Sequence, residues 1–151
     1  MISLSAALEG ICIIRHADRC ESSVPIGGFC TGNHQDVLQP GDLLRNITLP
    51  AAGLRRVTAF RRSSLTHLGR STALLVGTLD PNDGGFALMV SASTDRFVRI
   101  SFDRVPDRQA LRDRLSLEIR IFFDDAHGSP DYREHMTYHF AEQIQRELGG
   151  Q

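Results

Sequence analysis

Several signatures that would assign a protein to a class at once are missing from these 151 residues. There are three cysteines, Cys12, Cys20 and Cys30, but no C-x-x-C pair, so zinc ribbons and iron–sulfur ligation by this chain are not supported. No apolar run approaches the roughly 18 residues of a transmembrane helix, and the opening stretch lacks the basic start of a signal peptide. We therefore expect reduced thiols, a cytoplasmic location and no membrane partner.

A strong charge imbalance is also absent. The net charge is −1, which gives no global field for nucleic acid or an anionic membrane. Only Phe60 supplies an aromatic side chain among the clustered basic residues, so a nucleic-acid partner is not expected either. The hydrophobic content of 41% is ordinary for a globular protein and is enough for a core at this length. The basic cluster consists of Arg55, Arg56, Arg61, Arg62 and Arg70.

Catalytic and metal-binding motifs are equally scarce. The chain has no G-x-S-x-G elbow, no P-loop and no G-x-G-x-x-G. His135 and His139 have the i, i+4 spacing of helical zinc ligands, but Met136 stands where the zinc-protease pattern needs a glutamate. The polar flank of an amphipathic helix is the simpler interpretation. Asp124 and Asp125 could form an acid/base pair, or they belong to a loop before a capped helix. We predict no catalytic residue and no metal ligand.

The first fifty residues read as a small, incomplete unit. We expect a helical turn at residues 3–9, then strands at residues 11–16 and 20–26 that form a hairpin. Residues 27–40 are rich in glycine and proline and read as a loop. A further strand covers residues 42–49 and stops at Pro50, and A-A-G at residues 51–53 reads as a linker. The predicted boundary separates residues 1–50 from residues 51–151.

The second part has a more complete pattern. Alternation predicts strands at residues 55–62, 71–79, 86–93 and 96–102, with the D-P-N-D-G-G turn between the second and third. A short helix follows at residues 106–115. Ser129 and Pro130 start a last helix, which Gly149 ends. Its apolar stripe predicts an α+β fold, in which a small antiparallel sheet of three to four strands is covered by the C-terminal helix. The stripe consists of Tyr132, Met136, Phe140, Ile144 and Leu148.

Four short motifs occur in an order that resembles a known family. They are L-Q-P-G-D-L-L-R-N-I-T-L-P, R-R-V-T-A-F-R-R-S-S, the Asp-Gly hairpin, and D-D-A-H-G-S-P-D-Y-R-E-H-M. Together they resemble the C-terminal part of the FAD-binding subunit of the molybdenum hydroxylases, the xanthine dehydrogenase and carbon monoxide dehydrogenase family. In that family a strand of type P-x-E-x-L-x-x-I-x-I-P closes the FAD-binding domain, and A-F-[KR]-x-x-x-R opens a small C-terminal domain. The resemblance makes residues 1–50 the tail of the FAD-binding domain.

The resemblance implies two flavin contacts. By position, Leu44 would pack on the isoalloxazine ring and Arg61 would lie near its polar edge, where a cation favours the reduced anionic flavin. The alternatives are a plain core leucine and a solvated strand arginine. The family's partners would be a molybdenum-cofactor subunit and an iron–sulfur subunit, in an enzyme that passes electrons from molybdenum to FAD and on to an acceptor.

The chain also departs from the family pattern. The glycine-rich loops that hold the FAD diphosphate, of types A-G-G-T-D and G-G-N-[IL], lie upstream of the motifs matched here, and no acidic residue follows the arginines in S-L-T-H-L-G-R-S-T-A. We therefore expect that this chain alone does not bind FAD, and that an N-terminal half or a partner chain supplies the rest. The alternative function is a non-enzymatic α+β protein-interaction domain.

Overall fold

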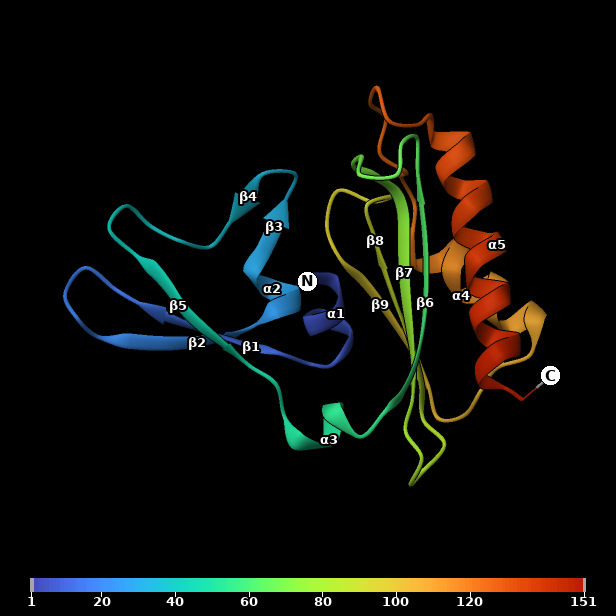
Figure 1. Ribbon diagram of the computed structural model, residues 1–151, viewed down its shortest axis with the longest axis horizontal. Helices are drawn as coiled ribbons and strands as arrows, with labels where there is room; N and C mark the ends of the chain where they lie inside the picture. Colours follow the sequence, from blue (N-terminus) through green and yellow to red (C-terminus); the bar gives the residue numbers. More distant parts are fainter. Residues whose placement is uncertain (1, 151) are drawn as a thin grey trace.

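The computed structural model describes residues 2–150 and arranges them around two separate antiparallel sheets and a short hairpin (Figure 1). The elements in chain order are α1 (Ile2–Ala7), β1 (Ile11–Arg15), β2 (Glu21–Pro25), α2 (Ile26–Phe29), β3 (Cys30–Gly32), β4 (Gln35–Asp36), β5 (Leu43–Thr48), α3 (Ala51–Leu54), β6 (Val57–Ser64), β7 (Ser71–Leu79), β8 (Phe86–Ser91), β9 (Val98–Phe102), α4 (Arg108–Glu118) and α5 (Pro130–Leu148).

The N-terminal sheet has the strand order β2-β1-β5, with all pairs antiparallel. The predicted hairpin is confirmed, because β1 pairs with β2 from Ile11 opposite Pro25 to Arg15 opposite Glu21. The expectation of a plain loop over residues 27–40 is corrected: this stretch contains most of α2 and the short β3–β4 hairpin. Burial of Ile26 and Phe29 gives α2 an apolar anchor, which a count of glycines and prolines does not reveal.

The C-terminal sheet has the strand order β6-β7-β8-β9, again with all neighbours antiparallel. The turn D-P-N-D-G-G joins β7 to β8, with Leu79 opposite Phe86. Asp80 caps this turn by accepting from the backbone N–H of Asn82, and Gly84 takes a positive φ of 78°. The structure therefore confirms four consecutive strands, and β6 and β9 are the edges.

Helix α5 lies along one face of this sheet, and α4 lies beside it (Figure 1). Ser129 caps α5 through the backbone N–H of Tyr132, as its sequence predicted. Phe140, Ile144 and Leu148 are buried in the core beneath α5, which confirms the α+β fold with a covering C-terminal helix. Each buried side chain of this size contributes on the order of 1.5–3 kcal/mol by leaving water. None of the helices within residues 2–150 is long and apolar enough to cross a membrane.

The opposite face of the sheet carries the N-terminal elements (Figure 1). Helix α1 contacts β7 and β8. A second apolar cluster joins Cys12 and Ile14 of β1 to Val76 of β7 and Met89 of β8. The boundary between residues 50 and 51 stays a prediction, and this shared cluster is what packs the two predicted parts together.

Candidate functional site

Leu44 lies on β5, an edge strand of the N-terminal sheet. It is opposite Ile14 of β1 and is half-buried against the cluster that contains Cys12 and Ile26. Its neighbour Leu43 is exposed. The side chain of Leu44 thus serves as core in this structure, and its contact with a flavin ring stays a prediction.

Arg61 lies on β6 and extends across the face that α5 covers. Its Nε donates to Oε1 of Gln143 at 2.8 Å, and its Nη2 donates to Oε2 of Glu147 at 2.5 Å. Ala59, two residues earlier on the same strand face, belongs to the core beneath α5. Arg61 therefore ties the edge strand to the last two turns of α5.

Leu44 and Arg61 are not brought together by the fold. Leu44 belongs to the cluster on the N-terminal side of the C-terminal sheet, whereas Arg61 bonds to α5 on the other side. A flavin that touched both would have to reach around the edge of β6. The role of Arg61 at a flavin stays a prediction, and its charge already has a partner in Glu147.

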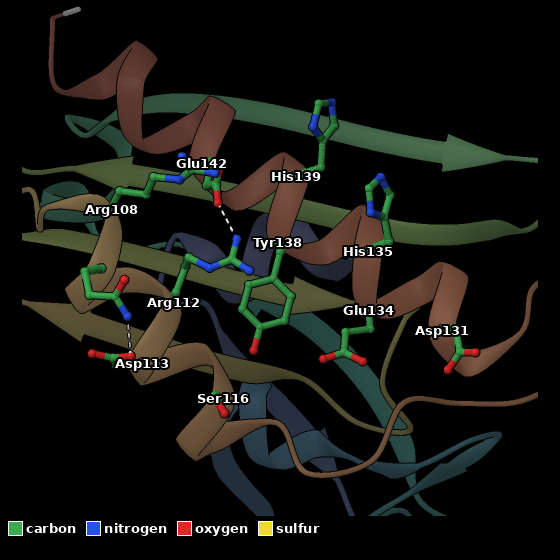
Figure 2. A pocket seen from close by; sticks show the side chains of 11 residues that line it. Arg108, Arg112, Asp113, Ser116, Asp131, Glu134, His135, Tyr138, His139 and Glu142 are labelled. Atoms are coloured by element: carbon green, nitrogen blue, oxygen red, sulfur yellow. Dashed lines mark hydrogen bonds and ion pairs between the residues drawn. The ribbon is translucent and has the colours of Figure 1, made fainter.

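A polar groove runs between α4 and α5 (Figure 2). It encloses about 620 Å³ and is lined mostly by charged side chains, with Tyr138 on its wall. Arg112 reaches across from α4, and its guanidinium carbon lies 4.7 Å from the centre of the Tyr138 ring. The i, i+4 spacing of Arg108 and Arg112 was the sequence signal for this groove, and our sequence analysis missed it.

Glu142 is the electrostatic centre of the groove. It accepts from Arg112 at 2.5 Å and pairs with Arg108 at 3.0 Å. Burial opposes ionisation of Glu142, but the hydrogen bonds from Arg108 and Arg112 outweigh it and lower the pKa of this carboxyl. Glu142 therefore offsets one of the two positive charges and bridges the two arginines, and these ion pairs hold α4 to α5.

The two histidines of the predicted polar flank stack on α5. The rings of His135 and His139 are nearly parallel, and their centres are 6.2 Å apart. Both rings point away from α4 (Figure 2). His139 Nε2 is 2.8 Å from Nε2 of Gln143. Within residues 2–150 no group of three or more histidine, cysteine, aspartate or glutamate residues is placed to hold a metal ion.

The acidic pair predicted from the sequence and the two less exposed thiols have structural surroundings. Asp125 forms an ion pair with Arg133, so it does not act as a free acid/base partner of Asp124. The pKa of the Cys12 thiol is raised, mainly by burial and further by the neighbouring Cys30. The pKa of the Cys30 thiol is also raised, mainly by burial and further by the charge of Asp36. Raised thiol pKa values leave little thiolate, the form that acts as a nucleophile. Neither the Asp124–Asp125 pair nor these two thiols therefore forms a catalytic centre.

The known proteins that resemble this chain are found by comparing its fold with solved structures. No family model matches the sequence, and no curated protein matches it. Quinoline 2-oxidoreductase from Pseudomonas putida 86 matches with a TM-score of 0.75 at 17% identity, over 99% of this chain and 56% of that one. Carbon monoxide dehydrogenase from Hydrogenophaga pseudoflava matches with a TM-score of 0.80 at 15% identity, over 99% and 55%. The enzyme from Oligotropha carboxidovorans gives 0.78 at 16%, over 95% and 54%.

These matches confirm the predicted resemblance at the level of the fold. The chain has the fold of part of a molybdenum hydroxylase chain, and it spans just over half the length of each chain that it matches. The order of motifs in the sequence and the arrangement of elements in space thus agree on the same fold.

Proposed function

We propose that this chain is the C-terminal part of the FAD-binding subunit of a cytoplasmic molybdenum hydroxylase. In this role it packs beside the flavin and against partner chains, while electrons pass from molybdenum and iron–sulfur centres to FAD and then to an acceptor. The observation that supports this most is the fold match, which takes in 95–99% of the chain with TM-scores of 0.75–0.80.

The residues present fit the ring end of FAD in part and the diphosphate end not at all. Leu44 offers a half-buried apolar side chain on β5, and Arg61 offers a cation on β6, but the two lie on opposite sides of the C-terminal sheet, so this arrangement presents them to a ring one at a time. Leu44 and Arg61 are the two residues to which the resemblance assigns a contact with the isoalloxazine ring. A diphosphate needs convergent backbone N–H groups, and the sequence contains neither of the glycine-rich loops that supply them in the family. When bound, FAD would supply the two-electron redox chemistry.

The proposal names its partners accordingly. The diphosphate cradle would come from an N-terminal half or a separate chain, and the other partners would be the molybdenum-cofactor and iron–sulfur subunits. The chain would position the ring and contribute surface for assembly, without a redox centre of its own.

The test is to isolate the tagged chain from the cells that produce it and to analyse what accompanies it. We expect FAD, molybdenum and iron in the isolated complex, measured by the flavin spectrum after acid release and by metal analysis. The 151-residue chain produced alone should be colourless. Isolation of the natural assembly without flavin or molybdenum would refute the proposal.

A non-enzymatic interaction domain is the second candidate. The observation that favours it is the uncovered outer edge of β6, to which no strand pairs within residues 2–150. An exposed edge strand is a template for pairing with another chain. The same isolation separates the two functions, because an interaction domain would bring partner proteins without flavin.

A further inference from the structure

Three polar side chains at the turn of the β1–β2 hairpin form a chain of hydrogen bonds that the proposed function does not use. His16 follows β1, and its Nδ1 lies 3.0 Å from Oδ1 of Asp42, which directly precedes β5. Its Nε2 lies 2.8 Å from Oγ of Ser22 on β2. Carboxylate, imidazole and hydroxyl stand in the order in which a serine becomes a nucleophile. His16 and Asp42 are 26 residues apart in the chain, so no sequence motif marks them.

Asp42 is held in place from two sides. Only 6% of its side chain is exposed, and its Oδ2 accepts from the backbone N–H of Gln39 at 3.1 Å. The preceding Gly41 has a φ of 90°, and a Cβ there would lie 3.0 Å from Cβ of Ala17, so glycine lets this loop approach the hairpin turn. The pKa of the Asp42 carboxyl is lowered, chiefly by the backbone N–H of Gln39 and further by His16, although burial opposes this. Asp42 therefore carries a negative charge at neutral pH.

The charge of Asp42 decides which ring nitrogen of His16 carries the proton. An ionised carboxylate can only accept hydrogen bonds, so Nδ1 of His16 must be the donor. In the neutral ring Nε2 is then the acceptor, and the hydroxyl of Ser22 donates to it. In this arrangement the imidazole can take the hydroxyl proton as a general base. Ser22 is exposed, and so is 35% of the His16 side chain, so a substrate reaches Oγ from solvent.

We propose that Ser22 is a nucleophile, that His16 is its general base and that Asp42 positions His16, in a site that takes activated acyl donors such as aryl esters. The hairpin turn projects away from the C-terminal sheet and from α5 (Figure 1). A developing oxyanion is solvated by water there instead of being enclosed by the protein, so the site suits substrates whose leaving group departs easily. This activity goes beyond the proposed function, because neither flavin nor a partner chain takes part in it.

The reaction balances as the hydrolysis of an ester. Oγ of Ser22 bonds to the acyl carbon while its proton passes to Nε2 of His16. The bond from the acyl carbon to the alcohol oxygen then breaks, and the leaving alcohol takes that proton. A water molecule next adds to the acyl carbon and gives a proton to Nε2. The carboxylic acid leaves, and Oγ regains the proton from Nε2.

The experiment treats the 151-residue chain with p-nitrophenyl acetate and, separately, with an alkyl fluorophosphonate. The fluorophosphonate forms a bond from Oγ to phosphorus and loses fluoride, while the proton goes to His16. The chain contains no lysine, which removes the commonest competing acyl acceptor. We expect release of p-nitrophenolate above the buffer rate and a single phosphonyl adduct on Ser22, located by fragment-ion mass spectrometry. No adduct, or an adduct on another residue, would overturn the proposal.

Ser23 supplies the matched control. Ser22 and Ser23 are both exposed on β2, and successive side chains of a strand point to opposite faces. Ser22→Ala should lose the adduct, and Ser23→Ala should keep it at the parent rate. His16→Gln should slow adduct formation by about 10²-fold, as loss of a general base does. The melting temperature of each variant is measured alongside. Equal labelling of Ser22→Ala and Ser23→Ala would contradict the assignment.

Asp42 needs a readout that a purely structural role would not change. Asp42→Asn removes the charge that fixes the proton on Nδ1, so the proton should move to Nε2 and adduct formation should slow by about 10²-fold or more. The ¹⁵N chemical shifts of the His16 ring report the tautomer directly. If labelling slows while the tautomer stays that of the parent, Asp42 does not position His16 as proposed.

This proposal and the proposed function fail separately. An isolated complex with FAD and molybdenum whose Ser22 resists the fluorophosphonate leaves the proposed function standing and removes the nucleophile. A labelled Ser22 in an assembly without flavin does the reverse.

Discussion

Arg133 donates from Nη2 to Oδ1 of Asp125 at 2.5 Å, and this pair closes the C-terminal unit beneath the start of α5. Only 1% of Arg133 is exposed. Its Nε donates to the carbonyl of Gly128 at 2.9 Å, and Nη1 donates to the carbonyls of Thr72 and Ala92. One arginine thus joins the loop before α5 to the start of β7 and the end of β8.

Replacing Arg133 should therefore be severe. Arg133→Met keeps an apolar stem of similar length but leaves Asp125 without its cation and strands three backbone carbonyls. Loss of one partner of a buried pair costs about 3–5 kcal/mol, so we expect a loss of that size in the free energy of unfolding, measured by chemical denaturation.

Arg146→Met is the matched control, since Arg146 is exposed near the end of α5 and its Nε donates to the carbonyl of Glu142 at a long 3.4 Å. Its cost should stay within about 0.5 kcal/mol. If Arg133→Met and Arg146→Met unfold at the same denaturant concentration, the pair of Arg133 with Asp125 does not stabilise the fold as described here.

Asp125 should also make stability depend on pH. Burial opposes its ionisation, but the backbone N–H of His127 and the guanidinium of Arg133 outweigh it and lower the pKa of this carboxyl. A lowered pKa contributes stability that is fully present above the unfolded value of about 3.9 and is lost as pH falls through the folded value. We expect unfolding free energy to fall below about pH 4. The Asp125→Asn variant should show a shallower fall, and an unchanged slope would contradict this assignment.

The sequence predicted the regular elements better than the buried polar ones. Strand β7 matches its predicted range, and α5 begins at Pro130 as its cap requires. The predicted apolar stripe on α5 is confirmed at Phe140, which is buried. It is wrong at Tyr132, which is 42% exposed and has its hydroxyl 3.2 Å from Oγ of Ser63. A count of apolar residues along a helix does not detect polar side chains that are buried because partners elsewhere in the chain form hydrogen bonds with them.

Arg133 and Thr137 are two such buried polar residues. Both are buried on α5, and Thr137 donates to the hydroxyl of Ser93, 44 residues earlier. Their spacing of four continues through Ala141, which is the signal that could have found them. The flavin contacts assigned to Leu44 and Arg61 came from motif order alone, so only a bound state can test them.

Gly77 on β7 sets how closely α5 approaches the sheet. A Cβ added there would lie 2.1 Å from Cγ2 of Ile144 and 3.1 Å from Cδ1 of Leu148. Gly77→Ala must push α5 outward and should cost about 1–3 kcal/mol of unfolding free energy, as overpacking does. Gly27→Ala, where a Cβ meets nothing within 4 Å, should be neutral or slightly stabilising. A melting temperature of Gly77→Ala equal to that of Gly27→Ala would show that α5 is not seated so tightly.

The last prediction concerns Arg61 in the assembled, flavin-containing complex. A cation about 4 Å from the ring interacts with the reduced anion by on the order of 4 kcal/mol at an effective dielectric near 20, and its ion pair with Glu147 offsets part of this. Arg61→Ala should therefore lower the flavin midpoint potential. Glu147→Gln should raise it, because the arginine then acts uncompensated. Arg62→Ala should leave it almost unchanged, since Arg62 projects from the opposite face of β6 and bonds to Ser71. The measurement is a spectroscopic redox titration of the three variants alongside chemical denaturation. If Arg61→Ala lowers only the free energy of unfolding, Arg61 anchors α5 to the edge strand and does not tune a flavin.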